Sequence, residues 1–191
     1  MKTTKIGGFK KSKINFYYGS NAQPKIRARF FPFASNYENA LIKTLSLNTR
    51  SEVKDARFHI RIYAANKDGQ PGQFLHDKII KGIAKKGNQV TVIDLTHLNL
   101  TFPQNGIFIA IEWLIIEQNK YWNKGKDLET KKKVKEMAFA PLFGTMTSEQ
   151  NENSWIFENG QWTKVEENAA YFGKKERFKF NVLAMELVLI K

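Results

Sequence analysis

The longest apolar stretch of the chain runs from Gly106 to Ile116 and contains a single charged residue, Glu112. Successive residues of a strand point to opposite faces, and here both faces are apolar. Ile, Phe and Trp favour strands, and Pro103 with Gly106 marks the start of the stretch. At eleven residues it is too short to cross a bilayer as a helix. The pattern therefore predicts a central strand that is buried on both faces.

Shorter stretches of alternating apolar and polar residues predict further strands. The clearest alternation lies at residues 57–63, where aliphatic and aromatic residues share one face. The other face carries Arg57, His59, Arg61 and Tyr63. A second alternating stretch, Lys25 to Phe33, places Arg27 and Arg29 on one face, so its pattern predicts a strand with a mixed surface.

The C-terminal part of the chain predicts a hairpin and one more long strand. Aromatic residues flank Asn159-Gly160, and Asn-Gly is the preferred two-residue turn of a β-hairpin. Phe180 to Ile190 is apolar apart from Glu186 and is expected to form a second long strand. The charged segment from Asn119 to Glu136 is expected to be a long exposed loop with at most one helical turn.

About ten short strands with closely spaced turns predict an all-β fold, an antiparallel β-sandwich with a jelly-roll-like arrangement in which late strands pair with early ones. Residues 14–191 are expected to form this single domain. Residues 1–13, which include Gly7, Gly8 and several lysines, are expected to be a flexible basic tail.

Composition narrows the classes of function. The chain of 191 residues has no cysteine, which excludes disulfides, thiolate metal sites and a cysteine nucleophile. Its first residues are basic but are not followed by the apolar segment of a secretory signal. The net charge of +13 is concentrated in residues 1–65, which hold 13 Lys and Arg against 3 Asp and Glu. This bias favours an anionic partner: nucleic acid, an acidic polysaccharide or a membrane surface.

Three segments, Arg61 to Gly72, Asp94-Leu95 and Phe102 to Trp113, resemble a domain of bacterial, mainly Bacteroidota, proteins. It looks like the β-sandwich region that follows a carboxypeptidase-regulatory-like, or transthyretin-like, repeat. The resemblance covers roughly residues 25 to 190 and includes the 153–162 hairpin and the closing Ala184 to Leu187. It implies an accessory or binding module of uncharacterised function in the cell envelope or periplasm, rather than an enzyme. Neither the repeat nor a signal peptide is found in this chain.

Two acids stand alone in apolar strands, Glu112 and Glu186. A buried carboxylate needs a partner because its desolvation is costly, and Arg29 and Arg61 are the candidate partners. Structural ion pairs are the expected role of these acids. The alternative is that both carboxylates face one cleft and act as the acid and base of a glycosidase.

No metal or cofactor is expected. Asn66, Asp68 and backbone carbonyls of the 66–72 turn are Ca²⁺-type ligands, but the turn lacks the carboxylate density of a calcium loop. His59, His76 and His97 have no metal-ligand spacing. A plain turn and surface histidines are therefore predicted.

Arg57, His59, Arg61 and Tyr63, joined by Arg27 and Arg29 from a neighbouring strand, form the candidate ligand-binding face. Sugars stack on aromatic rings, and single-stranded nucleic acid uses aromatic platforms in a basic groove. The same residues can instead support a neighbouring domain. A second aromatic set suits glycan stacking or, more commonly, core filling: Trp122, Trp155, Trp162 and Tyr171.

The sequence thus favours a non-catalytic accessory or ligand-binding module of a bacterial cell-envelope protein, with glycan or another anionic polymer as its partner. A nucleic-acid-binding protein that uses the basic N-terminal third is the alternative, and a glycosidase-like enzyme is the third hypothesis. The oligomeric state is left open.

Overall fold

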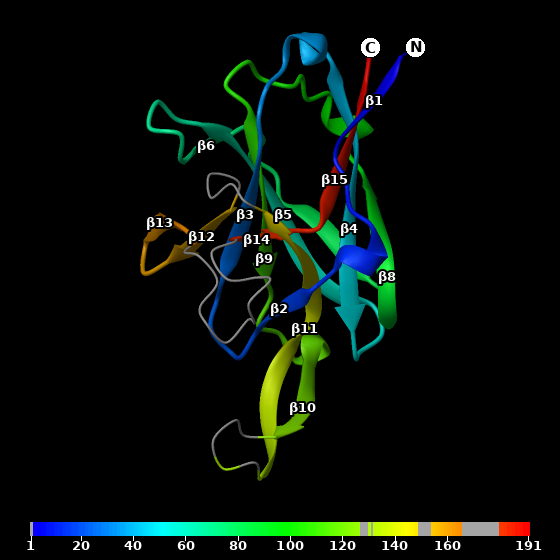
Figure 1. Cartoon of the computed structure of the whole chain (residues 1–191), viewed down its shortest axis with the longest axis vertical. Coiled ribbons are helices and arrows are strands. Elements are labelled where there is room, and N and C mark those ends of the chain that lie inside the picture. The colour runs from blue at the N-terminus through cyan, green and yellow to red at the C-terminus, as the bar shows by residue number, and fades with distance from the viewer. Residues whose placement is uncertain (1, 127–129, 131, 149–153, 166–179) are drawn as a thin grey trace.

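The computed structural model of the chain describes residues 2–126, 130, 132–148, 154–165 and 180–191 (Figure 1). In this part of the chain two antiparallel sheets pack face to face, which confirms the predicted β-sandwich. The sandwich has fifteen strands within the described residues, more than the ten expected. Strands also form at Thr3–Gly7 and Lys120–Lys126, where a tail and a loop were expected, and the 180–190 stretch contains two strands. None of the described helices has the length and apolar character that crossing a bilayer requires.

One sheet has eight strands. They are β1 (Thr3–Gly7), β2 (Phe16–Ser20), β4 (Leu41–Ser51), β8 (Gly87–Asp94), β10 (Lys120–Lys126), β11 (Lys133–Ser148), β14 (Phe180–Leu183) and β15 (Met185–Ile190). The late strand β15 pairs with the early strands β1 and β4, as the sequence predicts.

The other sheet has seven strands. They are β3 (Ile26–Phe31), β5 (Ala56–Ala65), β6 (Pro71–Phe74), β7 (Ile80–Ala84), β9 (Ile107–Trp113), β12 (Ser154–Glu158) and β13 (Gln161–Lys164). Short 3₁₀ turns lie at η1 (Lys11–Lys13), η2 (Ser35–Tyr37), η3 (Thr96–Leu98) and η4 (Glu117–Asn119).

The central strand predicted at 106–116 is β9, which pairs with β3 on one side and β5 on the other. Its odd-numbered residues, such as Ile109 and Ile111, lie in the core between the sheets, together with Leu45 and Leu187 of the opposite sheet. Its even-numbered residues Phe108 and Ala110 lie on the other face of the sheet and are equally buried. Both faces of β9 are therefore covered, as its continuous apolar sequence requires.

The prediction of a flexible tail at residues 1–13 is wrong for residues 3–7, which form β1 and pair with β15. Ile6 is its single buried apolar side chain, so the segment has too few apolar residues to be recognised from sequence. Gly7 ends the strand with φ +80°, and a Cβ there would lie 2.7 Å from the ring of Phe31. Glycine is needed at this position because the backbone is left-handed and the ring leaves no room.

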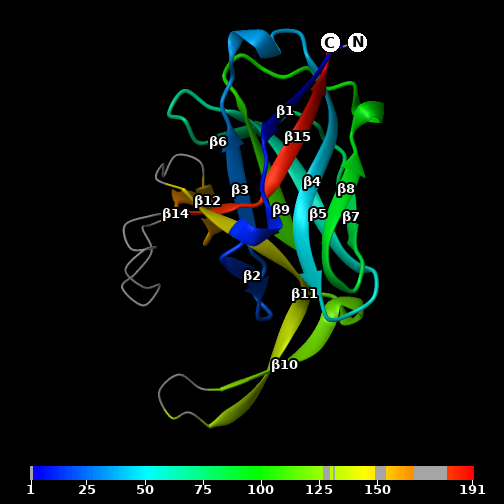
Figure 2. The same cartoon turned by 45° about the vertical axis from the view of Figure 1, so that its right-hand side comes forward.

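The prediction of a long loop at 119–136 is also wrong for residues 120–126 and 133–136, which form strands. Lys120–Lys126 is strand β10, and it pairs with the first part of β11. Both strands extend beyond the sandwich, at the bottom of Figures 1 and 2. A strand pair that stands away from the core buries little on either face, so its sequence is polar and does not alternate.

The other two C-terminal predictions have different outcomes. The hairpin is confirmed: β12 and β13 pair, and the turn residues Asn159 and Gly160 have φ of +52° and +82°. The long strand predicted at 180–190 is divided at Ala184 into β14, which pairs with β11, and β15, which pairs with β4.

Candidate binding face on the seven-stranded sheet

The candidate site is the face of the seven-stranded sheet that points away from the eight-stranded sheet, which we call the outer face. Strand β5 runs through it between β9 and β7. Its core residues Phe58, Ile60 and Ile62 point inward, so Arg57, His59, Arg61 and Tyr63 point outward. The register places His59 between Glu112 of β9 and Lys81 of β7.

An ionic cluster occupies the middle of the outer face. Arg61 Nη2 and Nε lie 2.7 and 2.8 Å from Oε2 of Glu112, and His59 Nδ1 lies 3.4 Å from the same oxygen. All three side chains are 20 to 25% exposed. Arg61, one of the two arginines predicted as partners of the lone acids, is thus the partner of Glu112. The carboxylate fixes the direction in which both basic groups point.

Aromatic rings line one side of this cluster. Tyr63 is 6% exposed, its ring centroid is 4.6 Å from that of Phe74, and burial raises the pKa of its hydroxyl to about 12. Phe74 is 51% exposed, and the guanidinium of Arg61 lies 5.6 Å from the centroid of its ring. A cation at this distance is attracted to the ring face. Phe74 and Arg61 therefore present a flat apolar surface beside a positive charge.

The outer face is concave. Trp162 of β13 meets Tyr63 of β5 edge-to-face at 5.4 Å, although the two strands are four places apart in the sheet. The β12–β13 hairpin thus curls over the outer face, where Trp155 covers Ala28 and Phe108. In a strongly twisted sheet that bends in this way, the edge strand borders one side of the face.

The opposite side of the ionic cluster is a hollow of about 380 Å³. Its lining includes the basic residues Arg57, His59 and Lys81 and the apolar residues Ile83, Leu114 and Ile116. Arg57 and Lys81 are exposed, and no described acid lies within ion-pair distance of either. The hollow therefore combines free positive charge with an apolar surface, a combination that suits an anionic ligand with apolar ring faces.

Arg27 and Arg29 do not belong to this face, so their assignment to it is wrong. They alternate with the outer-face residues of β3 and point between the sheets. Arg29 Nη1 donates hydrogen bonds to the carbonyls of Leu183 and Met185, at 2.9 Å each, and burial lowers its pKa to about 10. The guanidinium of Arg27 stacks on Tyr18 at 3.3 Å, and burial lowers its pKa as well. Both arginines join the two sheets, so neither can contact a ligand on the outer face.

Glu112 and Glu186 do not face a common cleft. Glu186 forms an ion pair with Lys5 at 3.0 Å, and its neighbours Met185 and Leu187 lie in the core. It therefore points away from the sandwich on the eight-stranded sheet, whereas Glu112 points away on the seven-stranded sheet. The core separates the two carboxylates, which contradicts the acid–base pair of a glycosidase.

The 66–72 turn is held by its own side chain. Asn66 Oδ1 accepts hydrogen bonds from the backbone N–H groups of Asp68 and Gln70, at 3.0 and 2.8 Å. This oxygen is therefore engaged in an Asx turn. In the described part of the chain, His, Asp and Glu side chains do not gather in groups of three that would suit a metal ion.

The second aromatic set is dispersed. Trp155 is buried at 2% exposure, Trp162 is half-buried on the outer face, and Trp122 is 52% exposed on β10. Tyr171 lies outside the described residues. Sequence reasoning did not identify Phe74, Lys81 and Ile83 as part of the outer face, because only the pairing of β6 and β7 with β5 brings them there.

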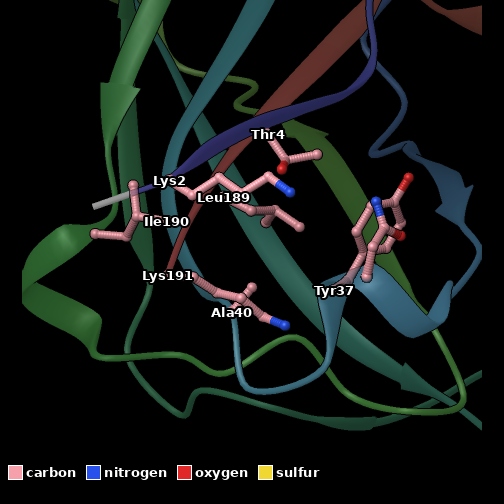
Figure 3. A pocket seen from close by; sticks show the side chains of 8 residues that line it. Lys2, Thr4, Tyr37, Ala40, Leu189, Ile190 and Lys191 are labelled. Atoms are coloured by element: carbon pink, nitrogen blue, oxygen red, sulfur yellow. The ribbon is translucent and has the colours of Figure 1, made fainter.

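A second, smaller pocket lies at the opposite end of the molecule from the β10–β11 hairpin (Figures 1 and 3). Its volume is about 120 Å³, and Lys2, Thr4, Tyr37, Ala40 and Leu189 are among the residues that line it. This volume suits a few water molecules or one small ion. The outer face remains the larger candidate surface.

No family model matches the sequence, and no curated protein matches it. The fold is similar to a structure of a variant of the clostridial cysteine protease Cwp84 after propeptide cleavage, with a TM-score of 0.59 and 10% identity. It is also similar to a structure of the cysteine protease and lectin-like domains of Cwp84, a surface layer associated protein of Clostridium difficile, with a TM-score of 0.52 and 11% identity.

These two superpositions cover 98% and 90% of this chain but 40% and 32% of the other chains. This chain therefore spans less than half of the length of either structure. At such low identity the likeness shows a shared β-sandwich fold.

Proposed function

We propose that the chain is a non-catalytic binding module that holds a glycan, or another polymer with anionic groups, on its outer face, as an accessory part of a bacterial cell-envelope protein. The observation that carries the proposal is that one face of the sheet holds the exposed ring of Phe74 beside Arg61 and, on the other side of the ionic cluster, the cations Arg57 and Lys81. Rings stack on the apolar faces of sugars, and the basic groups pair with carboxylate, sulfate or phosphate substituents.

The fold comparison supports the same class of function. One of the two similar structures contains a lectin-like domain and comes from a surface layer associated protein. A β-sandwich with a concave, basic and aromatic face is a suitable scaffold for such a role, since binding groups on paired strands are held rigidly.

The arrangement of the acids supports a non-catalytic role. Glu112 is held in an ion pair with Arg61, whereas the acid of a glycosidase must be free to donate its proton to the substrate. The second carboxylate of a glycosidase pair is not beside it, and the chain contains no cysteine that would serve as a protease nucleophile.

The test is a glycan array together with an oligonucleotide panel, probed with the intact chain at roughly physiological salt. The double variant Arg57→Gln/Lys81→Gln is expected to weaken capture of the selected glycan at least about tenfold, because each ionic hydrogen bond that it removes contributes to binding. Phe74→Ala should weaken capture without changing its dependence on salt. The matched control is Lys85→Gln/Lys86→Gln, which removes the same charge from the exposed turn between β7 and β8.

Equal loss in the control and in Arg57→Gln/Lys81→Gln would show that net charge alone causes the capture, and would contradict a site on the outer face. Hydrolysis of the captured glycan that disappears in Glu112→Gln would contradict the non-catalytic role. Selective capture of oligonucleotides that requires Arg57 and Lys81 would replace glycan by nucleic acid as the ligand of this face.

A further inference from the structure

The strand pair that projects from the sandwich has one face rich in lysine. We call β10 together with residues 133–137 of β11 the arm. The register places Trp122 opposite Met137 and Lys124 opposite Lys135, and Lys133 lies two residues before Lys135 on the same strand. Residues directly opposite in an antiparallel pair share a face, so these positions lie on one side of the arm. Tyr121, Asn123 and Glu136 occupy the other side.

Beyond the base of the arm, the described residues of the lysine face include no Asp or Glu. At the base, Lys120 is paired with Glu117 at 3.2 Å. Lys124, Lys133 and Lys135 are exposed, and no described carboxylate lies within ion-pair distance of them. Like charges directly opposite each other destabilise a strand pair. The facing Lys124 and Lys135 therefore cost stability that a bound anion would restore.

An aromatic ring stands beside these charges. Trp122 is 52% exposed, and the ammonium of Lys135 lies 4.7 Å from the centroid of its ring. This contact holds the ring in place and leaves much of its surface open. Farther along the arm, a hollow is lined by Lys124, Gly125, Lys133, Val134 and Lys135.

We propose that the lysine face of the arm binds single-stranded nucleic acid, with Trp122 stacking on a base and Lys124, Lys133 and Lys135 contacting phosphates. This combination of an aromatic platform with flanking cations is the chemistry by which proteins hold single strands without reading their sequence. The site lies on the other sheet from the outer face, so it is independent of the function proposed for that face.

The spacing of the lysines matches the spacing of phosphates along a single strand. Residues two apart on a strand are about 6.7 Å apart. A peptide residue has three backbone bonds and extends about 3.5 Å. A nucleotide has six backbone bonds, twice as many, so the phosphates of an extended nucleic-acid strand are about 7 Å apart. A bilayer would require a broad apolar surface, whereas the arm is two strands wide and exposes one large apolar ring.

The experiment measures the binding of a short, fluorescently labelled oligothymidylate by anisotropy, with the intact chain and at several salt concentrations. Trp122→Ala is expected to weaken binding about tenfold or more, because stacking of one base on an aromatic ring contributes on this scale. Lys124→Gln/Lys135→Gln should reduce the slope of log affinity against log salt by about 0.7 for each phosphate that the variant no longer neutralises. Lys85→Gln/Lys86→Gln and the outer-face variant Arg57→Gln/Lys81→Gln are the matched controls.

A folding measurement accompanies the binding measurement. Because Lys124→Gln/Lys135→Gln removes a like-charge pair, its melting temperature is expected to equal or exceed that of the unmodified chain, so a loss of binding cannot come from unfolding.

The proposal would be overturned if the oligonucleotide did not bind at roughly physiological salt, or if the control variants weakened binding as much as the arm variants. It would also be overturned if a sulfated polysaccharide or anionic vesicles displaced the oligonucleotide equally well from the unmodified chain and from Trp122→Ala. Glycan capture by the outer face is measured separately, with a glycan array as the ligand, so the two proposals can fail independently.

Discussion

Arg61 and Glu112 face each other from the neighbouring strands β5 and β9, and two guanidinium nitrogens of Arg61 lie within 2.8 Å of one carboxylate oxygen of Glu112. Both side chains are about three-quarters buried, at 25 and 22% exposure. A charge in such a place is tolerated only when it is paired. The pair therefore has a structural function whether or not Arg61 also contacts a ligand.

Removing one member of this pair should destabilise the fold more than removing both. Arg61→Gln is expected to lower the free energy of unfolding by roughly 1 to 3 kcal/mol, because Glu112 keeps its charge and retains only His59. Arg61→Gln/Glu112→Gln should recover most of this loss. Urea unfolding of Arg61→Gln, Glu112→Gln and the double variant measures the coupling energy between the two side chains, and strictly additive losses would contradict the prediction.

Arg29 is predicted to stabilise the contact between the two sheets. Arg29→Met removes the donor to the carbonyls of Leu183 and Met185, but it also removes the desolvation cost that lowers the pKa of this guanidinium to about 10. The Met185 carbonyl keeps a second hydrogen bond, from the N–H of Gly8.

The missing hydrogen bonds outweigh the relief of desolvation, and the net loss is expected to be roughly 1 to 2 kcal/mol in the free energy of unfolding. Thermal and urea unfolding provide the measurement. Lys5→Gln, which removes an exposed cation from β1, should cost less, and an Arg29→Met protein as stable as the parent would refute the argument.

Tyr63 should ionise at unusually high pH. Burial raises the pKa of its hydroxyl to about 12 in the folded chain from 10 in the unfolded chain. The unfolded chain therefore loses this proton first, so a rise of pH from about 10 to 12 favours unfolding through this group. A spectrophotometric titration should show a phenolate that forms near pH 12 and is missing in Tyr63→Phe. If both titration curves agree above pH 11, Tyr63 is not shifted.

The sequence predicted those parts of the fold in which local pattern and tertiary packing agree. The run containing Ile109 and Ile111 is apolar on both faces because neighbouring strands and the second sheet cover both faces of β9. Asn159 and Gly160 have the positive φ that their residue types favour, so the hairpin could be recognised from two residues.

The parts that sequence reasoning did not recover depend on contacts between distant segments. Strand β1 contains one buried apolar residue and is stabilised by its pairing with β15, at the other end of the chain. Among its described residues, the arm has no buried face beyond its base, so its composition resembles that of a loop.

The residues of the candidate site were likewise predicted where local alternation decides their position and missed where the pairing of distant strands decides it. Arg57, His59, Arg61 and Tyr63 share one face because a strand alternates, and this was predictable. Arg27 and Arg29 were assigned to this face wrongly, because alternation within two strands does not show which face of one strand lies on the same side of the sheet as a given face of the other. The pairing of β3 with β9 decides this, and it turns both arginines toward the core.

Asn119 should anchor the arm to the sandwich. Its side chain is fully buried and makes three hydrogen bonds: Nδ2 donates to the carbonyls of Arg57 and Leu114, at 2.7 and 3.0 Å, and Oδ1 accepts from the N–H of Arg57 at 2.8 Å. Asn119→Ala leaves these groups unpaired and is expected to lower the free energy of unfolding by roughly 2 to 4 kcal/mol, measured by urea unfolding. Asn123→Ala, which changes an exposed asparagine on the adjoining strand β10, is the control and should change stability by less than about 0.5 kcal/mol. Equal losses in the two variants would mean that Asn119 does not act as an anchor.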